Sequence, residues 1–400
     1  MTPPAEHAGR WSRYGLITTL VVVAGALCLR KPGVFVQPQF WAEDASIFYS
    51  QAMLDGRAAV FRPYNGYLHL VPRLTAALAA AGNPLYAPTV FLATSVLLTL
   101  AVAAACFSPR LHLPYPPLWA LAIVLVPHTG EVFNNLTNLQ WILALGLLLL
   151  LLAEDARTPW QWGADLGSII LLGLTGLFVV LWLPLVGWRF RRRRTLASGV
   201  LAGLAAVFAG IQIAALVAHP APQLPGLSPW ADWLRQPCQR LAGSLFMPAA
   251  FAEHTPFVFM AGVGMAWFGG MVWLAATAPS PREHRWMMLA AAALIVAGVL
   301  YKFRGDLGQI RPIGNGDRYF YLPKVILLWS LVCELNGGGW RRWLSGALLS
   351  LSLLISTTGF QAAANVDYHW PRFAARIRVG DPVTVPINPP GWTMSFPRRR

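Results

Sequence analysis

Long apolar blocks, separated by shorter polar stretches, dominate the sequence. A bilayer core of about 30 Å requires roughly 20 apolar residues in helical form, so these blocks predict membrane-spanning helices. The blocks cover residues 14–29, 84–107, 117–126, 139–153, 196–218, 256–278, 286–301, 321–335 and 343–361. Residues 165–188 allow two interpretations, either one span or two short helices broken near residues 173–176.

Arginine-rich loops orient these blocks. Short loops rich in Lys and Arg stay on the cytoplasmic side of a membrane, which places residues 188–194 and the N-terminal Arg10 and Arg13 inside. Both conditions hold only if residues 165–188 form the broken pair. We therefore predict an all-α polytopic membrane protein with about eleven membrane segments, its N-terminus cytoplasmic and its C-terminus extracytoplasmic.

This topology divides the chain into two parts. Residues 1–361 form a transmembrane module with a first outer loop over residues 30–83, and residues 362–400 form an extracytoplasmic tail. Residues 385–392 read Val-Pro-Ile-Asn-Pro-Pro-Gly-Trp, which is too rich in proline for a helix. We expect this stretch to be extended and to lie over the outer face.

Composition narrows the possible classes of function. Of the 400 residues, 56% are hydrophobic and 12% are charged, whereas soluble domains carry roughly 25% charged residues. The mean hydropathy is +0.51. The net charge of +15 comes from basic residues scattered among many loops, so we expect no nucleic-acid partner. Four cysteines without metal-ligand spacing indicate neither a zinc site nor a disulfide framework.

An acidic pair, Glu43-Asp44, follows the first apolar block. Ala45, Phe48 and Ala52 come next at helical spacing, which predicts a helix lying in the membrane interface. The pair has a structural interpretation as a helix cap, because acidic side chains complement the positive end of a helix. Its chemical interpretation is a general base, or a ligand for a divalent cation such as Mg²⁺ or Mn²⁺.

Two polar groups lie near the outer ends of the next blocks. Tyr67, His69 and Arg73 precede the second long block and would wall a polar pocket. Alternatively the histidine is structural and the arginine only extends its charge toward water. Glu131 and Asn138 belong to an amide-rich stretch at membrane depth. Such groups are costly there unless they line a cavity or cap a helix.

A late loop concentrates positive charge. Arg and Lys bind phosphate through charge-assisted hydrogen bonds. These cations therefore predict a phosphate site, unless they pair with the acidic residues of the same loop, Asp306 and Asp317. The members of this group are Lys302, Arg304, Arg318 and Tyr319, with Lys324 just inside the next block.

Together these features resemble the integral-membrane GT-C glycosyltransferases. That superfamily has an acidic motif in the first outer loop, interfacial helices after it and short broken membrane helices. Here Glu43-Asp44 stands at the position of the motif, and Asp317-Arg318-Tyr319-Phe320 looks like a late Arg-Tyr element of some bacterial members. The resemblance implies an inverting enzyme that moves a sugar from a polyprenyl-phosphate donor to a hydroxyl of a glycan or lipid acceptor. The tail is a departure, because many relatives carry a sizeable soluble domain there.

The resemblance also implies roles. Asp44 would be the general base, and Glu43 would orient the acceptor or bind a divalent cation. Lys302, Arg304 and Arg318 would neutralise the lipid phosphate with help from Arg73. The other candidate substrate-binding residues are Tyr67, His69, Glu131, Asn138 and Tyr319.

Arginine far outnumbers lysine, which is typical of GC-rich bacterial genomes and implies the bacterial inner membrane.

Two other functions stay open. A transporter or flippase of lipid-linked glycans would require charged residues deep within its spans, and the centres of the predicted spans lack them. A non-catalytic subunit of an envelope-assembly complex would tolerate loss of the acidic pair. The sequence therefore favours the enzyme.

Overall fold

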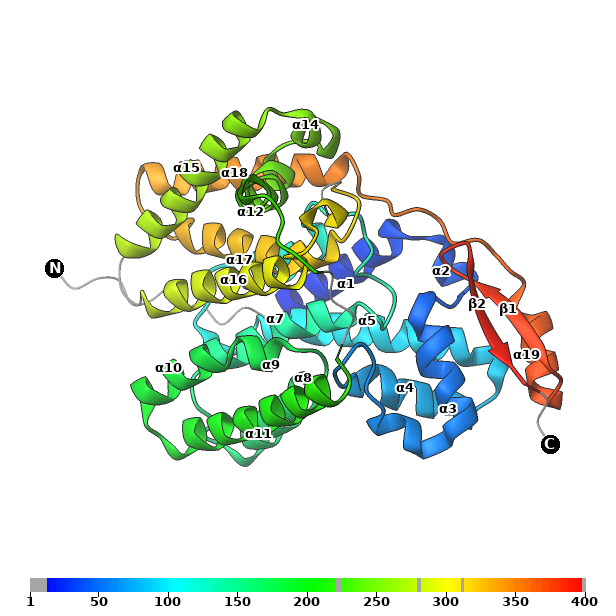
Figure 1. Cartoon of the computed structure of the whole chain (residues 1–400). Coiled ribbons are helices and arrows are strands. Elements are labelled where there is room, and N and C mark those ends of the chain that lie inside the picture. Colours follow the sequence, from blue (N-terminus) through cyan, green and yellow to red (C-terminus); the bar gives the residue numbers. More distant parts are fainter. Residues whose placement is uncertain (1–12, 221–224, 279–281, 311–312, 398–400) are drawn as a thin grey trace.

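The computed structural model describes residues 13–220, 225–278, 282–310 and 313–397. The protein is mostly helical, at 71%. Figure 1 shows a body of packed helices, with the C-terminal segment forming a separate layer at one edge. The predicted all-α character is therefore confirmed for the body, and the tail is the exception described below.

Five helices in the described part of the chain are long and apolar enough to cross a membrane. At most 39% of the residues in an 18-residue window of each helix are buried, so most residues of these apolar helices keep some surface outside the protein core. Exposed apolar surface on this scale indicates a membrane-associated protein. The five are α1 (Arg13–Arg30), η3 with α5 (Pro84–Ala105, where α5 is Ala87–Ala105), α11 (Leu196–Ala218), α15 (Phe257–Ala276) and α16 (Glu283–Lys302).

Two other apolar blocks form the core. Helices α7 (Leu139–Leu152) and α17 (Arg318–Glu334) are buried along nearly their whole length. Trp329 of α17 stacks on Trp119 of α6 (Pro116–Leu125) with ring centroids 4.9 Å apart, and its indole N–H donates to the Trp119 carbonyl. Helix α18 (Trp340–Thr357) packs beside α17.

The block that allowed two interpretations is a broken pair of helices. Helix α8 (Pro159–Gly173) ends where predicted, and α9 (Phe178–Leu181) and α10 (Leu183–Arg193) lead the chain back. Gln212 of α11 holds the break, because its amide donates to the carbonyls of Gly173 and Gly176 at 3.3 and 3.1 Å. Gly176 has a φ of +95°, which favours glycine.

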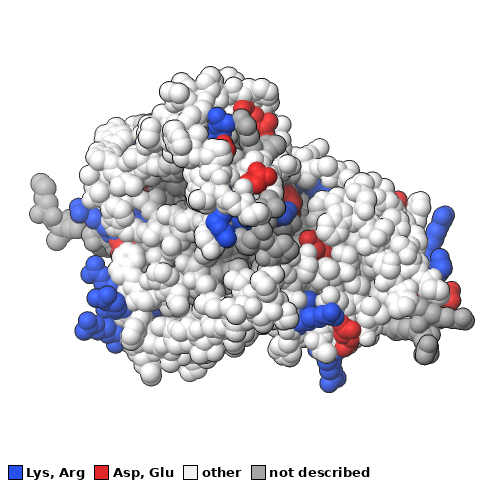
Figure 2. Space-filling model, in the orientation of Figure 1, with Lys and Arg blue, Asp and Glu red and all other residues white. Residues whose placement is uncertain are grey.

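The chain returns to the end of the molecule at which α8 begins. Arg189 near the end of α10 donates to the Leu151 carbonyl and to Asp155, which precedes α8. We call this the arginine-rich end, and Figure 2 shows blue side chains at the left, where α10 ends in Figure 1. The opposite end, where the first outer loop meets residues 126–138, 302–310 and 313–318, is called the loop end.

The first outer loop folds into short helices, as predicted. They are α2 (Gly33–Val36), a π-helical turn η1 (Asp44–Tyr49), α3 (Ser50–Asp55), a 3-10 turn η2 (Gly56–Phe61) and α4 (Leu70–Ala81). Ala45, Phe48 and Ala52 are all buried, so the predicted apolar face packs against the protein. Their placement in a membrane interface stays a prediction.

The connection between α11 and α15 is also helical in its described part. Its elements are α12 (Trp230–Pro237), η5 (Cys238–Gly243), α13 (Ser244–Phe246) and α14 (Ala249–His254). Two short 3-10 turns lie elsewhere in the chain, η4 (Pro109–Leu111) and η6 (Leu307–Ile310).

The tail contains a β-hairpin that the sequence did not predict. Helix α19 (Trp370–Val379) precedes strands β1 (Val383–Ile387) and β2 (Trp392–Phe396), which pair antiparallel. Residues 385–387 are extended, as expected, but the pairing of β1 with β2 corrects the prediction of a purely helical chain. Trp370 packs on Phe40 with ring centroids 5.0 Å apart. The tail therefore covers the first outer loop (Figure 1).

Candidate functional site

The two adjacent carboxylates of the acidic pair have different surroundings. Asp44 is buried, and its oxygens accept hydrogen bonds from the Leu136 N–H (3.0 Å), the Thr137 N–H (2.7 Å) and the Thr137 hydroxyl (2.7 Å). It also borders a small pocket shared with Gln39. Glu43 is half-buried and accepts a hydrogen bond from the Tyr64 hydroxyl at 3.2 Å. Asp44 therefore fixes the backbone that leads into α7, whereas Glu43 contacts the hydroxyl of Tyr64.

Burial raises the pKa of Asp44 to about 7, against the opposing effect of its three hydrogen bonds. Since the folded protein then holds a proton that the unfolded chain has released, stability is highest at acid pH and falls as the pH rises through about 7. We expect a loss on the order of 2 kcal/mol between about pH 5 and about pH 8. Unfolding midpoints in detergent micelles, compared with those of Asp44→Asn, measure it. Asp44→Asn should be less stable but should lack this part of the pH dependence, and equal slopes would contradict the assignment.

A tight turn places two tyrosines side by side next to Glu43. Asn65 and Gly66 have φ angles of +49° and +86°, as in the turns that close β-hairpins. The backbone groups of Tyr64 and Tyr67 bond to each other at 2.9 and 3.2 Å. The Tyr67 hydroxyl accepts a hydrogen bond of 3.4 Å from Gln140 on α7. This turn therefore joins the acidic pair to the start of a core helix.

The late cations approach the same place from the other side. Arg318 forms an ion pair with Glu131 and donates to the Tyr319 hydroxyl at 3.4 Å. Lys302, at the end of α16, donates to the same hydroxyl at 2.8 Å. The Tyr319 ring packs edge-on against Trp141 of α7 at 5.4 Å. Two cations thus converge on one tyrosine beside α7.

Tyr67 connects the two halves. Its hydroxyl accepts from Gln140, and the Tyr319 ring packs against the adjacent residue of α7, Trp141. Burial raises the pKa of Tyr67 to about 12. Six of the eleven predicted site residues are therefore brought together with Tyr64. We call this set the loop-end cluster: Glu43, Tyr64, Tyr67, Glu131, Lys302, Arg318 and Tyr319.

Four predicted residues next to the cluster have other partners. Arg73 donates to Gln51 at 2.6 Å and lies over the Phe48 ring. Arg304 donates to the Tyr301 carbonyl at 3.0 Å and lies over the Tyr301 ring. The residues that these two arginines contact here lie outside the loop-end cluster.

Asn138 and His69 are buried. The Asn138 amide donates to the Glu131 carbonyl at 3.1 Å, which holds the turn that carries Glu131. His69 stacks on Tyr67 with ring centroids 4.3 Å apart. Burial, and then the charge of Arg73, lower the pKa of His69 to about 3, which keeps the ring neutral at physiological pH. Both residues pack against members of the loop-end cluster, Asn138 against Glu131 and His69 against Tyr67.

A second charged group surrounds Asp317, and the sequence did not predict that its members meet. Asp317 is buried and binds the Lys324 ammonium at 2.7 Å, with the Thr129 N–H at 2.9 Å, His128 at 3.5 Å and Arg240 at 3.9 Å. Asp317 therefore neutralises Lys324, which lies within α17 beyond the late loop, while Arg318 pairs with Glu131. Asp317 and Lys324 are seven residues apart, two helical turns, and that spacing is a signal in the sequence.

The oxygens of the acidic pair already accept hydrogen bonds, and a divalent cation bound by this pair stays a prediction. Both oxygens of Asp44 already accept from N–H or O–H donors, and Glu43 is held by Tyr64. Across the described residues, no group of three or more His, Cys, Asp or Glu side chains is arranged to hold a metal ion.

Comparisons with protein-family models, with curated proteins and with solved structures found no match for this chain.

Proposed function

We propose that this chain is a membrane glycosyltransferase of the GT-C kind, which moves a sugar from a polyprenyl-phosphate donor to an acceptor hydroxyl. The observation that supports it is the loop-end cluster. In this cluster the carboxylate of Glu43 bonds to Tyr64, and two cations, Lys302 and Arg318, bond to Tyr319. A base and a phosphate site on one face are what such a transfer requires.

We assign the base to Glu43, the reverse of the roles expected from the sequence. Glu43 accepts one hydrogen bond from a neutral hydroxyl, whereas the oxygens of Asp44 are occupied by three donors. A base must reach the proton it removes. Asp44 is then a positioning residue, which fixes Glu43 relative to α7 through the backbone of residues 136 and 137.

The transfer proceeds by displacement at the anomeric carbon. Glu43 takes the acceptor O–H proton as the acceptor oxygen bonds to that carbon from the face opposite the phosphate. The bond between the anomeric carbon and the phosphate oxygen breaks, its electron pair leaves with polyprenyl phosphate, and the configuration inverts. Arg318 and Lys302 stabilise the negative charge that develops on the departing phosphate.

The outward apolar faces of the long helices support a lipid donor. At most 39% of the residues in each of the five are buried, and a polyprenyl chain would lie on the apolar surface that remains as readily as membrane lipid. With the remaining apolar helices, the proposal includes about eleven membrane segments in a bacterial inner membrane. The N-terminus would be cytoplasmic and the loop end and tail extracytoplasmic. The acceptor would be a glycan or a lipid.

Arg318→Ala is expected to weaken use of the donor by roughly tenfold to a hundredfold, because a charge-assisted contact to phosphate contributes about 1.5–3 kcal/mol. The measurement is release of polyprenyl phosphate from labelled polyprenyl-phosphate sugars by the purified protein, as a function of donor concentration. Arg304→Ala is the matched control, since that guanidinium lies over Tyr301. Equal losses in both variants, or unchanged donor use in Arg318→Ala, would contradict the proposed phosphate site.

One observation favours a second function, the transport of a lipid-linked glycan. Lys324, Asp317 and Arg240 are charged and buried together, and buried charges within a helical membrane protein are typical of translocation paths. Liposomes that contain the protein and a fluorescent lipid-linked sugar separate the two functions. Movement of intact donor between leaflets without release of sugar would favour transport.

A further inference from the structure

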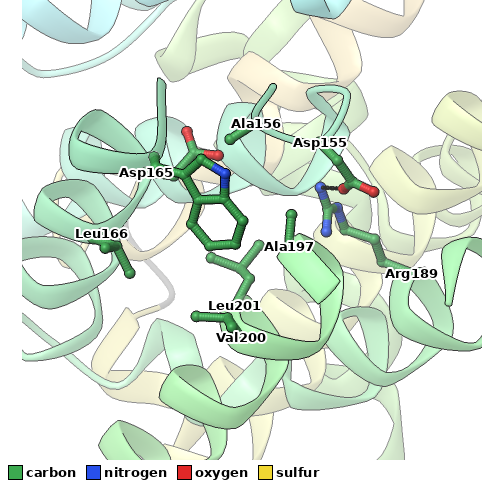
Figure 3. A pocket seen from close by; sticks show the side chains of 9 residues that line it. Asp155, Ala156, Asp165, Leu166, Arg189, Ala197, Val200 and Leu201 are labelled. Atoms are coloured by element: carbon green, nitrogen blue, oxygen red, sulfur yellow. Dashed lines mark hydrogen bonds and ion pairs between the residues drawn. The ribbon is translucent and has the colours of Figure 1, made fainter. Parts of the chain in front are cut away.

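A pocket at the arginine-rich end lies far from the loop-end cluster along the helices. It is formed by the first turns of α8 and α11 together with α10. Figure 3 shows Asp165 and Leu166 on one side, Asp155 and Arg189 on the other, and Val200 and Leu201 below. Most of the lining surface is apolar, and the charged groups lie at its rim.

The carboxylates of this rim are already neutralised. Asp155 accepts from Arg189 at 2.6 Å, from Arg193 at 3.2 Å and from the Thr195 hydroxyl at 2.5 Å. Asp165 accepts two hydrogen bonds of 2.7 Å from the guanidinium of Arg110. The pocket therefore offers no free negative charge to attract a cation.

The neighbouring arginines leave positive charge in excess. Arg191, Arg192 and Arg194 are exposed, and no carboxylate of the described residues lies within ion-pair distance of them. Arg194 stands between Arg193 and Thr195, both of which contact Asp155 at the rim. The excess charge therefore lies on the last turn of α10 and the residue that follows it, beside the rim of the pocket.

The surface around the pocket is apolar and aromatic. Trp160 at the start of α8 is 85% exposed, and Leu196 at the start of α11 is 79% exposed. Farther along α11, Val207 is also exposed. Tryptophan beside a band of aliphatic side chains is typical of the boundary between headgroups and acyl chains. The pocket thus opens where a lipid headgroup would meet its chains.

We propose that this pocket binds an anionic phospholipid of the adjacent leaflet. Its phosphate would bind the exposed guanidinium groups of Arg191, Arg192 and Arg194. One acyl chain would lie across the shallow opening of the pocket, on the outer side of Leu166 and Leu201. This inference does not depend on the proposed sugar transfer, because no residue of the loop-end cluster takes part.

Native mass spectrometry of the full chain, with added phosphatidylglycerol or phosphatidylcholine, tests the headgroup. The variant Arg191→Ala/Arg192→Ala/Arg194→Ala is expected to bind phosphatidylglycerol roughly tenfold or more weakly, with little change for phosphatidylcholine. The matched control is Arg372→Ala/Arg376→Ala/Arg378→Ala, which removes three exposed arginines of α19. Equal binding in both triple variants, or no preference for phosphatidylglycerol in the wild type, would overturn the proposal.

A second variant tests the pocket itself. Ala197 lines it, so Ala197→Phe should fill the space and weaken phosphatidylglycerol binding while every arginine remains. An unfolding midpoint equal to that of the wild type shows that the variant is folded. Binding unaffected by Ala197→Phe would indicate attraction to surface charge alone and would overturn the built site. Complete displacement of phosphatidylglycerol by excess inorganic phosphate would assign the site to free phosphate and would also overturn it.

Discussion

Glu43→Gln is expected to reduce sugar transfer by roughly 10²–10⁴-fold while the protein keeps its fold, because loss of a general base has effects of this size. The glutamine keeps an oxygen that can accept the hydrogen bond of Tyr64, so the surrounding tyrosines stay in place. What disappears is the ability to take a proton from the acceptor. The measurement is the initial rate of polyprenyl phosphate release at saturating donor, together with the unfolding midpoint.

The control for this variant removes a different carboxylate of the same loop. Asp55 pairs with Arg62 on an exposed part of the first outer loop, so Asp55→Asn should transfer sugar at close to the wild-type rate. Asp44→Asn should lose stability, because its amide N–H₂ would face backbone N–H donors. Full activity of Glu43→Gln, combined with an inactive but normally stable Asp44→Asn, would return the base to Asp44.

Lys324→Met should destabilise the protein by about 3 kcal/mol, because it leaves a buried carboxylate without its closest cation. Arg240, at 3.9 Å from Asp317, still offsets part of the charge, so the loss should lie toward the lower end of the range for broken buried pairs. Unfolding of the detergent-solubilised protein by denaturant measures the change. Lys302→Met, which removes a cation at an exposed position, should change stability by less than about 0.5 kcal/mol.

A double variant that removes both charges measures how much the ion pair between Asp317 and Lys324 itself contributes to stability. Asp317→Asn/Lys324→Met removes both members of the closest pair but leaves the buried Arg240 without the carboxylate 3.9 Å away, so we expect only part of the lost stability to return. The Asn side chain can still accept from the Thr129 N–H. A double variant as unstable as the sum of its two single variants would show that the ion pair itself contributes little.

Local patterns in the sequence predict local structure well here. The helix after the acidic pair follows from the spacing of Ala45, Phe48 and Ala52, all of which are buried. The broken helix pair follows from glycine at positions 173 and 176 and from the arginines at its end, which need to return to their starting side. In both cases the information lies within a few turns of one segment.

Partners distant along the chain could not be predicted in this way. Asp44 binds residues 136 and 137, more than ninety positions away, and no periodicity in either segment encodes that meeting. Hydropathy likewise cannot separate α7 and α17, which are enclosed by protein, from helices that face outward, because lipid and a protein core are equally apolar. The choice between Glu43 and Asp44 depends on such tertiary contacts.

The contact between the tail and the first outer loop has a consequence for biosynthesis. The carbonyl of Asn388 accepts from the Ala42 N–H, and its own N–H donates to the Phe40 carbonyl at 3.2 Å, directly before the acidic pair. Ribosomes add roughly 5–20 residues per second, so residues 40–42 wait roughly 20–70 seconds for these partners. During that interval residues 40–42 lack these partners, and the surface that the tail covers would be completed only after residue 388 has been synthesised.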